Sequence, residues 1–309
     1  MEAAVTDILR ADLEARSTKA LLERALIVSQ EDSDPEWEER SRIVATLQMR
    51  GDEETFEMAK NWCASPNATE RELAADLLTQ FGAGAQKNDG NVRFPSAHLT
   101  VPLLEKLIDD PDARVIASAV HGLGWNSASD AVLARPSLAK HSSHRVRFAV
   151  ACSLDGAESK AAIDILLALA QDDDDDVRDR ANWVLQGSRI DTPEIREVLF
   201  GNLSDRQTDT RCEAMVGLAR RKDARVIPYI QEELAADSVF YIAIEAAGHI
   251  ASPDLAESLE RLRARSDTDM QLVERALNRC KGIFDPDDDE LWVEENGIIV
   301  PTWATDKSS

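Results

Sequence analysis

Aromatic side chains are scarce in this 309-residue sequence: they make up 5% of it, although 43% of the residues are hydrophobic. Leucine and alanine supply most of the apolar content. Because β-rich proteins depend on aromatic and β-branched residues, the shortage argues against a β-rich fold and favours helices. The apolar total is still large enough to bury a core.

Long apolar runs are missing as well. No stretch approaches the roughly 18 apolar residues of a membrane-spanning helix. The N-terminal residues Met1–Asp7 also lack the basic segment and apolar run of a secretory signal. We therefore expect a cytoplasmic protein that has no membrane association.

Cysteines are few and widely separated, and no Cys-x-x-Cys pair occurs among Cys63, Cys152, Cys212 and Cys280. This spacing argues against a disulfide framework and against a zinc ribbon. Reduced, mostly buried thiols are the expectation.

Basic residues are in deficit: 35 lysines and arginines face 58 acidic residues, for a net charge of −23. Such a surface repels phosphate backbones and anionic lipids, so binding to nucleic acid or to a membrane is disfavoured, although a local basic patch could still exist. Solubility alone would also explain the charge.

An internal repeat organises the middle of the chain. Its starting residues are spaced 31, 31, 33 and 29 apart, and the five segments are Val115–Gly124, Val146–Asp155, Val177–Gln186, Thr210–Ala219 and Val239–Gly248. The fourth and eighth residues after each start are small or apolar, which places all three positions on one face of a helix. We interpret this row as core.

A second helix precedes each segment, and its last core leucine recurs at Leu107, Leu138, Leu169, Leu203 and Leu234. The connecting turns carry Asp, Pro and Ser, which end one helix and cap the next. A helix pair of about 31 residues cannot bury its own apolar face, so neighbouring pairs must stack. The prediction is an all-α protein, a right-handed α-solenoid or superhelix of two-helix repeats.

This pattern of an Asp-rich turn, Val-Arg, Ala and Leu resembles HEAT repeats, and Asp174–Ala181 fits best. The period is closest to the short repeats of phycobilisome-lyase-like HEAT proteins. The resemblance is clearest over residues 95–265. It implies an array over residues 36–282 with an insertion loop at 83–93, an N-terminal helical cap over 1–35, and a tail over 283–309 that follows an acidic linker.

The tail contains Asn296-Gly297 between two β-prone runs, which predicts a small C-terminal β-hairpin. An isolated hairpin is marginally stable. We therefore expect Trp292 and Trp303 to dock it on the last helices. The alternative is a flexible tail that docks on a partner or on a second copy.

Motifs for chemistry are absent. The run Asp172–Asp176 lacks the glycine and closing glutamate of a calcium loop, so we interpret it as a capping turn. The histidines lack the His-Glu pairs with which HEAT-repeat hydroxylases hold iron, and His141 and His144 have no evident third ligand. No nucleotide-binding loop occurs. We expect no catalytic residue, no metal and no cofactor.

The row of second helices lines the concave face in HEAT-like arrays, so its residues off the core face are the binding candidates: His121, Trp125, Arg180, Trp183, Arg220, Glu245 and His249. Tryptophan and arginine are enriched at binding hot spots. We expect Arg147, Arg178 and Arg211, just after the helix starts, to pair with the preceding turns instead.

These features favour a non-catalytic scaffold that binds a protein or peptide on the concave face, as a monomer or weak homo-oligomer. One alternative is an inhibitor or immunity-type protein for a basic partner, which an excess of carboxylates on that face would favour. Another is a HEAT-like enzyme, either a bilin lyase or an alkyl-base DNA glycosylase, in which Trp125, Trp183 and Asp179 would line the cleft. The net charge is poorly suited to gripping DNA.

Overall fold

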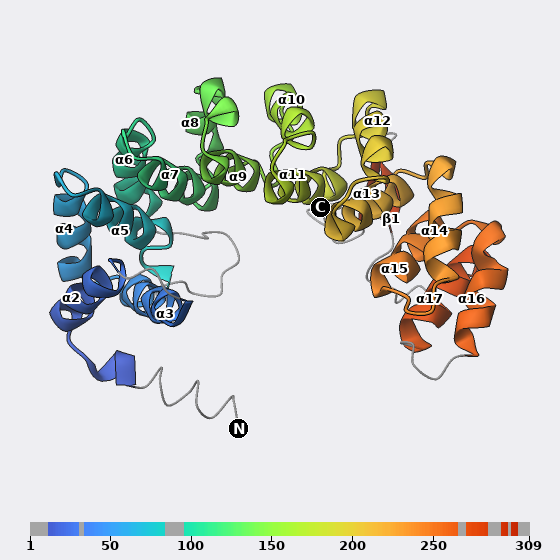
Figure 1. The fold of residues 1–309 in the computed structure, drawn as a ribbon, viewed down its shortest axis with the longest axis horizontal. Helices are drawn as coiled ribbons and strands as arrows, with labels where there is room; N and C mark the ends of the chain where they lie inside the picture. The colour runs from blue at the N-terminus through green and yellow to red at the C-terminus, as the bar shows by residue number, and fades with distance from the viewer. Residues whose placement is uncertain are drawn as a thin grey trace. The chain divides into compact units, whose positions relative to one another are not determined.

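Helix pairs make up the structure, a computed structural model that describes residues 12–30, 34–83, 96–264 and 270–283 and the backbone of 292–295 and 298–301. The chain divides into two compact units, residues 1–155 and 156–309. Each unit is a stack of helix pairs, and short turns connect the successive helices (Figure 1). None of the helices in these ranges is both long and apolar enough to cross a membrane.

The first unit begins with a helical layer at its N-terminal end and continues with helix pairs. Its elements are α2 (Thr18–Val28), α3 (Asp34–Arg50), α4 (Glu53–Trp62), α5 (Ala68–Thr79), α6 (Ala97–Leu107), α7 (Ala113–Trp125), α8 (Ser129–Leu133), the 3-10 helix η2 (Pro136–Lys140) and α9 (His144–Ser153). Helix α2 packs against α3, α4 and α5, and α5, α7 and α9 pack on one another in succession.

The second unit repeats this arrangement. Its elements are α10 (Lys160–Leu169), α11 (Asp175–Gly187), α12 (Pro193–Asn202), α13 (Thr208–Arg220), η3 (Ala224–Val226), α14 (Ile227–Leu234), α15 (Tyr241–Ile250), η4 (Pro253–Leu255), α16 (Ala256–Arg263) and α17 (Met270–Cys280). Helices α11, α13, α15 and α17 stack in succession. We call α5, α7 and α9 in the first unit, and α11, α13, α15 and α17 in the second, the second-helix row of each unit.

The predicted core row is confirmed. In α7, α11 and α13 the three repeat positions are fully buried, and all five leucines of the preceding helices are buried too. The exception is Val239, which is only half-buried because α15 begins two residues later, at Tyr241. The helical repeat architecture is therefore the one that the sequence predicts.

One first helix differs from the expected pattern. The segment before α9 is a short helix, α8, followed by the 3-10 helix η2, instead of one continuous helix. Proline has no N–H and disfavours a helical conformation in the residue before it. Arg135, just before Pro136, accordingly adopts φ −127° and ψ 67°. Leu138 is buried all the same, since η2 packs against α9.

An arginine follows three of the five repeat starts, and it ties its helix to the turn before it, as predicted. An Nη1 group donates to a carbonyl oxygen six residues earlier at 2.8–2.9 Å in the pairs Arg147–His141, Arg178–Asp172 and Arg211–Asp205. Asp174 caps α11 by accepting from the amide of Val177. The acidic run is thus a capping turn, in agreement with the sequence.

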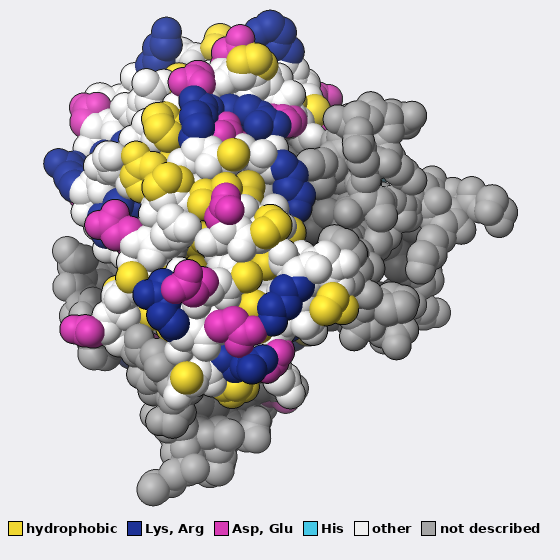
Figure 2. All heavy atoms as spheres, turned by 90° about the vertical axis from the view of Figure 1, so that its right-hand side faces the viewer, with side chains coloured by type: hydrophobic (Ala, Val, Ile, Leu, Met, Phe, Trp, Pro, Cys, Tyr) yellow, Lys and Arg dark blue, Asp and Glu magenta, His cyan; other side chains and the backbone are white. Residues whose placement is uncertain are grey.

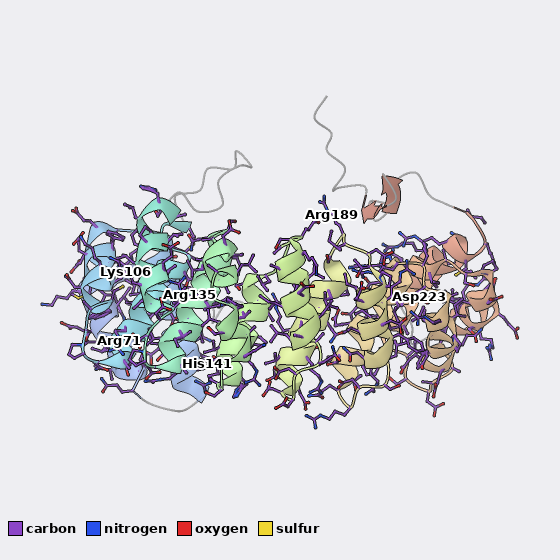
Figure 3. All side chains as sticks on the ribbon, turned by 90° about the horizontal axis from the view of Figure 1, so that it is seen from above. Arg71, Lys106, Arg135, His141, Arg189 and Asp223 are labelled. Atoms are coloured by element: carbon purple, nitrogen blue, oxygen red, sulfur yellow. The ribbon has the colours of Figure 1, made fainter. Side chains whose placement is uncertain are left out.

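Arg178, and Arg71 at the start of α5, which likewise donates to the carbonyl oxygen of Ser65 six residues earlier, also reach the next turn along the chain. Arg71, labelled in Figure 3, lies 2.7 Å from Asp110, and Arg178 lies 2.8 Å from Asp205. All four side chains are largely buried. The Arg178 guanidinium holds the pKa of Asp205 below its ordinary value. Each pair therefore links one repeat to the following one within the same unit.

Glycines allow the second helices to approach closely. A Cβ atom on Gly124 of α7 would lie 2.5 Å from the Cα atom of Ser153 in α9. In the second unit, a Cβ atom on Gly217 of α13 would lie 3.0 Å from the Cβ atom of Gln186 in α11. Side chains at these positions would push the helices apart.

The C-terminal strands β1 (Trp292–Glu295) and β2 (Ile298–Pro301) pair antiparallel, with Glu295 opposite Ile298. The docking of Trp292 and Trp303 concerns side chains outside the described residues and stays a prediction. The insertion loop at 83–93 also falls almost wholly outside the described residues. The predicted boundaries at residues 36 and 282 stay predictions.

Candidate functional site

The predicted binding residues fall in three groups on the second-helix rows. His121 and Trp125 lie on α7 of the first unit. In the second unit, Arg180 and Trp183 lie on α11, and the third group, Arg220, Glu245 and His249, spans α13 and α15. Within each group the side chains contact one another, as the following distances show.

The group in the first unit is an aromatic pair. Trp125 Nε1 donates to His121 Nε2 at 2.9 Å, and the two ring centroids lie 6.2 Å apart. The indole ring is 42% exposed. Phe148, on the neighbouring α9, is 38% exposed and was not predicted from the sequence. The first unit thus exposes an aromatic pair on α7 and a separate aromatic ring on α9.

Arg180 and Trp183 form a cation–π pair on α11. The guanidinium carbon of Arg180 lies 4.1 Å from the centroid of the Trp183 ring, which is 39% exposed. Arg180 Nε is enclosed and donates to no described residue. The stacked guanidinium restricts the indole ring, so the pair presents a preordered amphipathic surface.

Arg220 connects three helices of the second unit. Its Nη1 donates to Gln186 Oε1 on α11, and its Nη2 lies 3.5 Å from Glu245 on α15. Gln186 was not predicted as part of the site, because the repeat pattern gave it no special position. The guanidinium therefore braces the row as well as contributing to its surface.

His249 completes this group. It is 5% exposed, and burial lowers the pKa of its imidazole, so the ring is neutral. Its Nε2 lies 3.2 Å from Glu245 Oε1 and 3.5 Å from Arg220 Nε. We assign the Nε2 proton to the shorter contact with the carboxylate, which lowers the pKa of Glu245. His249 thus orients Glu245.

An acidic patch that sequence analysis did not single out as a binding site lies beside these groups. It consists of Asp176 and Asp179 on α11 and Asp209 and Glu213 on α13. None of the four makes an ion pair or side-chain hydrogen bond with any residue in the described ranges. Burial first, and then Asp179, raises the pKa of Glu213 to about 7. Burial and the nearby Asp209 likewise raise the pKa of Asp179.

Some charges beside the first helices are paired. Arg225 lies 2.7 Å from Glu197 and 2.8 Å from Asp223, and its guanidinium carbon lies 4.5 Å from the Phe200 ring centroid. Figure 2 shows the second unit from the side of α14 and α16, where acidic and basic side chains are interspersed. Glu232 and Glu257 on the first helices are also without an ion pair among the described residues, but they are exposed, whereas Asp179 and Glu213 on the second-helix row are half-buried.

In the described ranges, no group of three or more His, Cys, Asp or Glu side chains is arranged to hold a metal ion. His141 Nδ1 accepts the amide of Ser143 at 3.0 Å, which fixes the turn before α9. The structure therefore assigns His141 a contact within its own turn.

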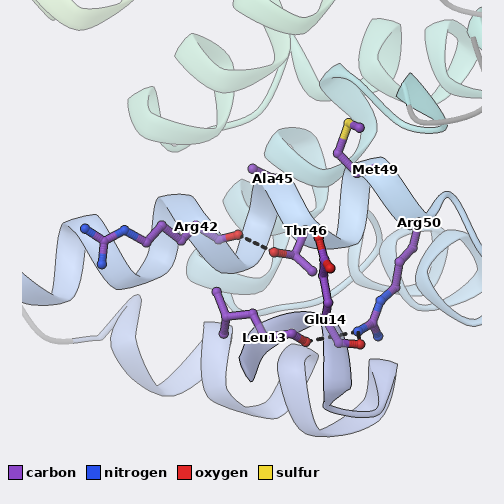
Figure 4. A pocket seen from close by; sticks show the side chains of 7 residues that line it. All are labelled: Leu13, Glu14, Arg42, Ala45, Thr46, Met49 and Arg50. Atoms are coloured by element: carbon purple, nitrogen blue, oxygen red, sulfur yellow. Dashed lines mark hydrogen bonds between the residues drawn. The ribbon is translucent and has the colours of Figure 1, made fainter. Parts of the chain in front are cut away.

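A cavity of about 510 Å³ lies near the start of the first unit (Figure 4). It is lined by Leu13, Glu14, Arg42, Ala45, Thr46, Met49 and Arg50. Arg50 Nη2 donates to the carbonyl oxygens of Leu13, Glu14 and Arg16 at 2.8–3.1 Å. Its guanidinium therefore holds the chain that enters α2.

The repeats of this chain match those of known proteins. A family model described as HEAT repeats matches residues 100–186, which include α7, α9 and α11. This segment of the chain therefore carries HEAT repeats. The more specific resemblance to phycobilisome-lyase-like repeats stays a prediction.

The protein YibA of Escherichia coli K12 is 27% identical over 242 residues, which are 76% of this chain and 83% of YibA. The X-ray structure of E. coli YibA superposes with a TM-score of 0.70 at 24% identity, covering 88% of this chain and 95% of that one. The crystal structure of an engineered protein gives a TM-score of 0.55 at 18% identity, covering 88% of this chain and 83% of that one. These structures show the HEAT-like fold alone.

Proposed function

We propose that this HEAT-repeat protein is a non-catalytic scaffold that binds a protein or peptide partner on its second-helix row. The observation that carries the proposal is the Arg180–Trp183 pair, an ordered and exposed aromatic surface beside unpaired carboxylates. Tryptophan and arginine dominate binding hot spots because they bury a large area and still make polar contacts. The remaining faces of these helices form the core.

Two features favour a protein partner over the DNA of an alkyl-base glycosylase. Asp179 and Trp183, which would line such a cleft, lie among the carboxylates of the acidic patch, and these would repel a phosphate backbone. The net charge of −23 acts in the same direction.

The test compares two cation–π pairs that differ in the face on which they lie. Tagged wild type, Arg180→Ala/Trp183→Ala and the control Phe200→Ala/Arg225→Ala are cross-linked in extract of the native cells, captured and analysed by mass spectrometry. Because loss of a hot-spot pair costs about 2 kcal/mol or more, we expect the partner yield to fall at least about 10-fold with the first variant and to stay unchanged with the control.

Circular dichroism melts establish that both variants are folded. A partner that is retained equally by the folded Arg180→Ala/Trp183→Ala variant would contradict the assignment of this surface. Failure to capture any protein with the wild type would contradict the scaffold function itself.

A further inference from the structure

We propose that the second-helix row of the second unit binds a lysine- or arginine-rich segment of the partner, whose cationic side chains are seated among Asp176, Asp179, Asp209 and Glu213. This inference rests on the proposed function and adds the chemical class of the partner. It follows from the position of the four carboxylates, from one enclosed oxygen atom and from the neighbouring aromatic ring.

The four carboxylates form one surface because their helices pack side by side. Helix α13 contacts α11 on one side and α15 on the other. The charges that act on Glu213 come from all three helices: Asp179 on α11, Asp209 and Arg220 on α13, and Glu245 on α15. Three of these four neighbours are acidic, so Glu213 lies where negative charge is concentrated.

The arginines of the same row offset the charge of the patch only in part, because burial and acidic neighbours still raise the pKa values of Asp179 and Glu213. Arg180 is stacked on Trp183, and Arg220 is engaged by Gln186 and Glu245. The largely buried carboxylate of Asp205 in the same unit is, by contrast, paired with Arg178. A cation supplied by a partner would therefore remove repulsion that the protein itself leaves in place.

One oxygen atom of the patch is closed off from solvent. Asp179 Oδ1 is buried and accepts no hydrogen bond within the described residues. A buried acceptor without a donor is costly, and a guanidinium or ammonium group at the accessible part of this half-buried carboxylate would offset that cost through its charge. This atom is an observation independent of the number of carboxylates.

The aromatic neighbour suits the same partner. Trp183 is one helical turn from Asp179 and keeps part of its ring exposed. Lysine and arginine have long apolar stems that pack on such rings while their charged ends reach a carboxylate. The row thus combines charge complementarity with an apolar contact.

The test uses defined peptides and two variants that lose the same number of carboxyl groups. Calorimetry at 0.15 M NaCl measures the binding of a nine-arginine and a nine-glutamate peptide to wild type and to Asp179→Asn/Asp209→Asn/Glu213→Gln. The matched control, Glu194→Gln/Glu232→Gln/Glu257→Gln, removes three carboxylates from α12, α14 and α16. We expect the arginine peptide to bind at least about 10-fold more weakly to the patch variant and within about twofold of wild type to the control.

A second measurement follows the proton on Glu213. Because a bound cation favours the ionised carboxylate, binding at pH 6.5 should release protons, which calorimetry in buffers of different ionisation enthalpy detects. Glu213→Gln should abolish most of this release. This single isosteric variant keeps the proposal testable even if the triple variant does not fold.

Equal weakening by the two triple variants would overturn the inference, because binding would then follow net charge alone. Tight calcium binding that displaces the arginine peptide would also overturn it, in favour of a metal site. Loss of a captured partner with Arg180→Ala/Trp183→Ala, combined with equal peptide binding by both triple variants, would overturn the basic partner and leave the scaffold function standing.

Discussion

The ionised carboxylate of Glu213 destabilises the folded protein at the second-helix row. A carboxyl group prefers water when it is ionised, and here small core residues such as Ala214 and Gly217 flank it on α13. Burial is the first cause of its raised pKa, and the acidic neighbours add to it. The protein therefore maintains an unfavourable charge at this position, which is common at binding surfaces and rare in purely structural ones.

Glu213→Gln should make stability less dependent on pH. The pKa of this group rises from 4.5 in the unfolded chain to about 7 in the folded protein. Between these values the folded state holds a proton that the unfolded chain has lost, so the free energy of unfolding decreases as pH rises. After allowance for partial exposure, we expect the variant to be about 1–2 kcal/mol more stable than wild type at pH 8 and equally stable at pH 4.5.

Urea denaturation at the two pH values measures this difference. Glu257→Gln, an exposed change on α16, serves as the control. Parallel pH profiles for wild type and Glu213→Gln would contradict the prediction.

The sequence predicts which residue types form the candidate site and that they lie on the second-helix row. It does not predict which residues of neighbouring helices they contact. His121 and Trp125 lie four residues apart on one helix, so periodicity places them together. Asp179 and Glu213 are 34 residues apart and occupy different positions within their repeats. Whether they interact depends on the stagger of α11 against α13, which a single sequence does not specify.

At the scale of the helix, close packing depends on glycine where two second helices meet. Gly124→Ala would bring a Cβ atom to 2.5 Å from the backbone of Ser153, and backbone cannot rotate away. We expect a loss of about 1–3 kcal/mol in the free energy of unfolding, measured by urea denaturation.

Gly201→Ala is the matched control, since Gly201 also lies near the end of its helix and a Cβ atom there meets nothing within 4 Å. Alanine favours helix over glycine, so this variant should gain up to about 1 kcal/mol. A similar effect of both substitutions would show that helix propensity, and not contact with α9, decides the outcome at Gly124.

The helices themselves were the most predictable level of structure. Core positions repeat at helical spacing and the turns carry capping residues, so local sequence decides where most helices begin and end. The segment from α8 to η2 departs from this, because Pro136 interrupts a run whose leucine spacing otherwise continues. Spacing reports which residues are buried, and it does not report whether the backbone between them is α-helical.

At the scale of the molecule, the chain divides into two compact units, residues 1–155 and 156–309. The repeat starts at Val146 and Val177 are 31 residues apart, like those before them, so periodicity gives no sign of a division after Asp155. The boundaries of the cap, the array and the tail were predicted from changes in composition along the chain. These changes lie near residues 36 and 282, and not near residue 155.

Net charge leads to a prediction for the whole chain. Raising NaCl from about 0.05 to about 0.5 M should raise the melting temperature by about 2–5 °C, because a charge of −23 repels itself and salt shortens the range of that repulsion. Exposed ion pairs also weaken in salt, but each contributes about 0–1 kcal/mol, so relief of repulsion should prevail.

Scanning calorimetry measures the effect, with choline chloride at equal ionic strength as the control. Equal increases in the two salts indicate screening. A melting temperature that falls with NaCl would show that ion pairs outweigh repulsion in this protein.

The arginine that grips its own turn and the aspartate of the following turn has an evolutionary consequence. Arg71–Asp110 and Arg178–Asp205 each place the donor in one repeat and the acceptor in the next. A tandem gene duplication that copies one whole repeat therefore copies a donor and an acceptor together, and both new junctions are complete at once. Arrays fastened in this way can change length by whole repeats without waiting for compensating mutations.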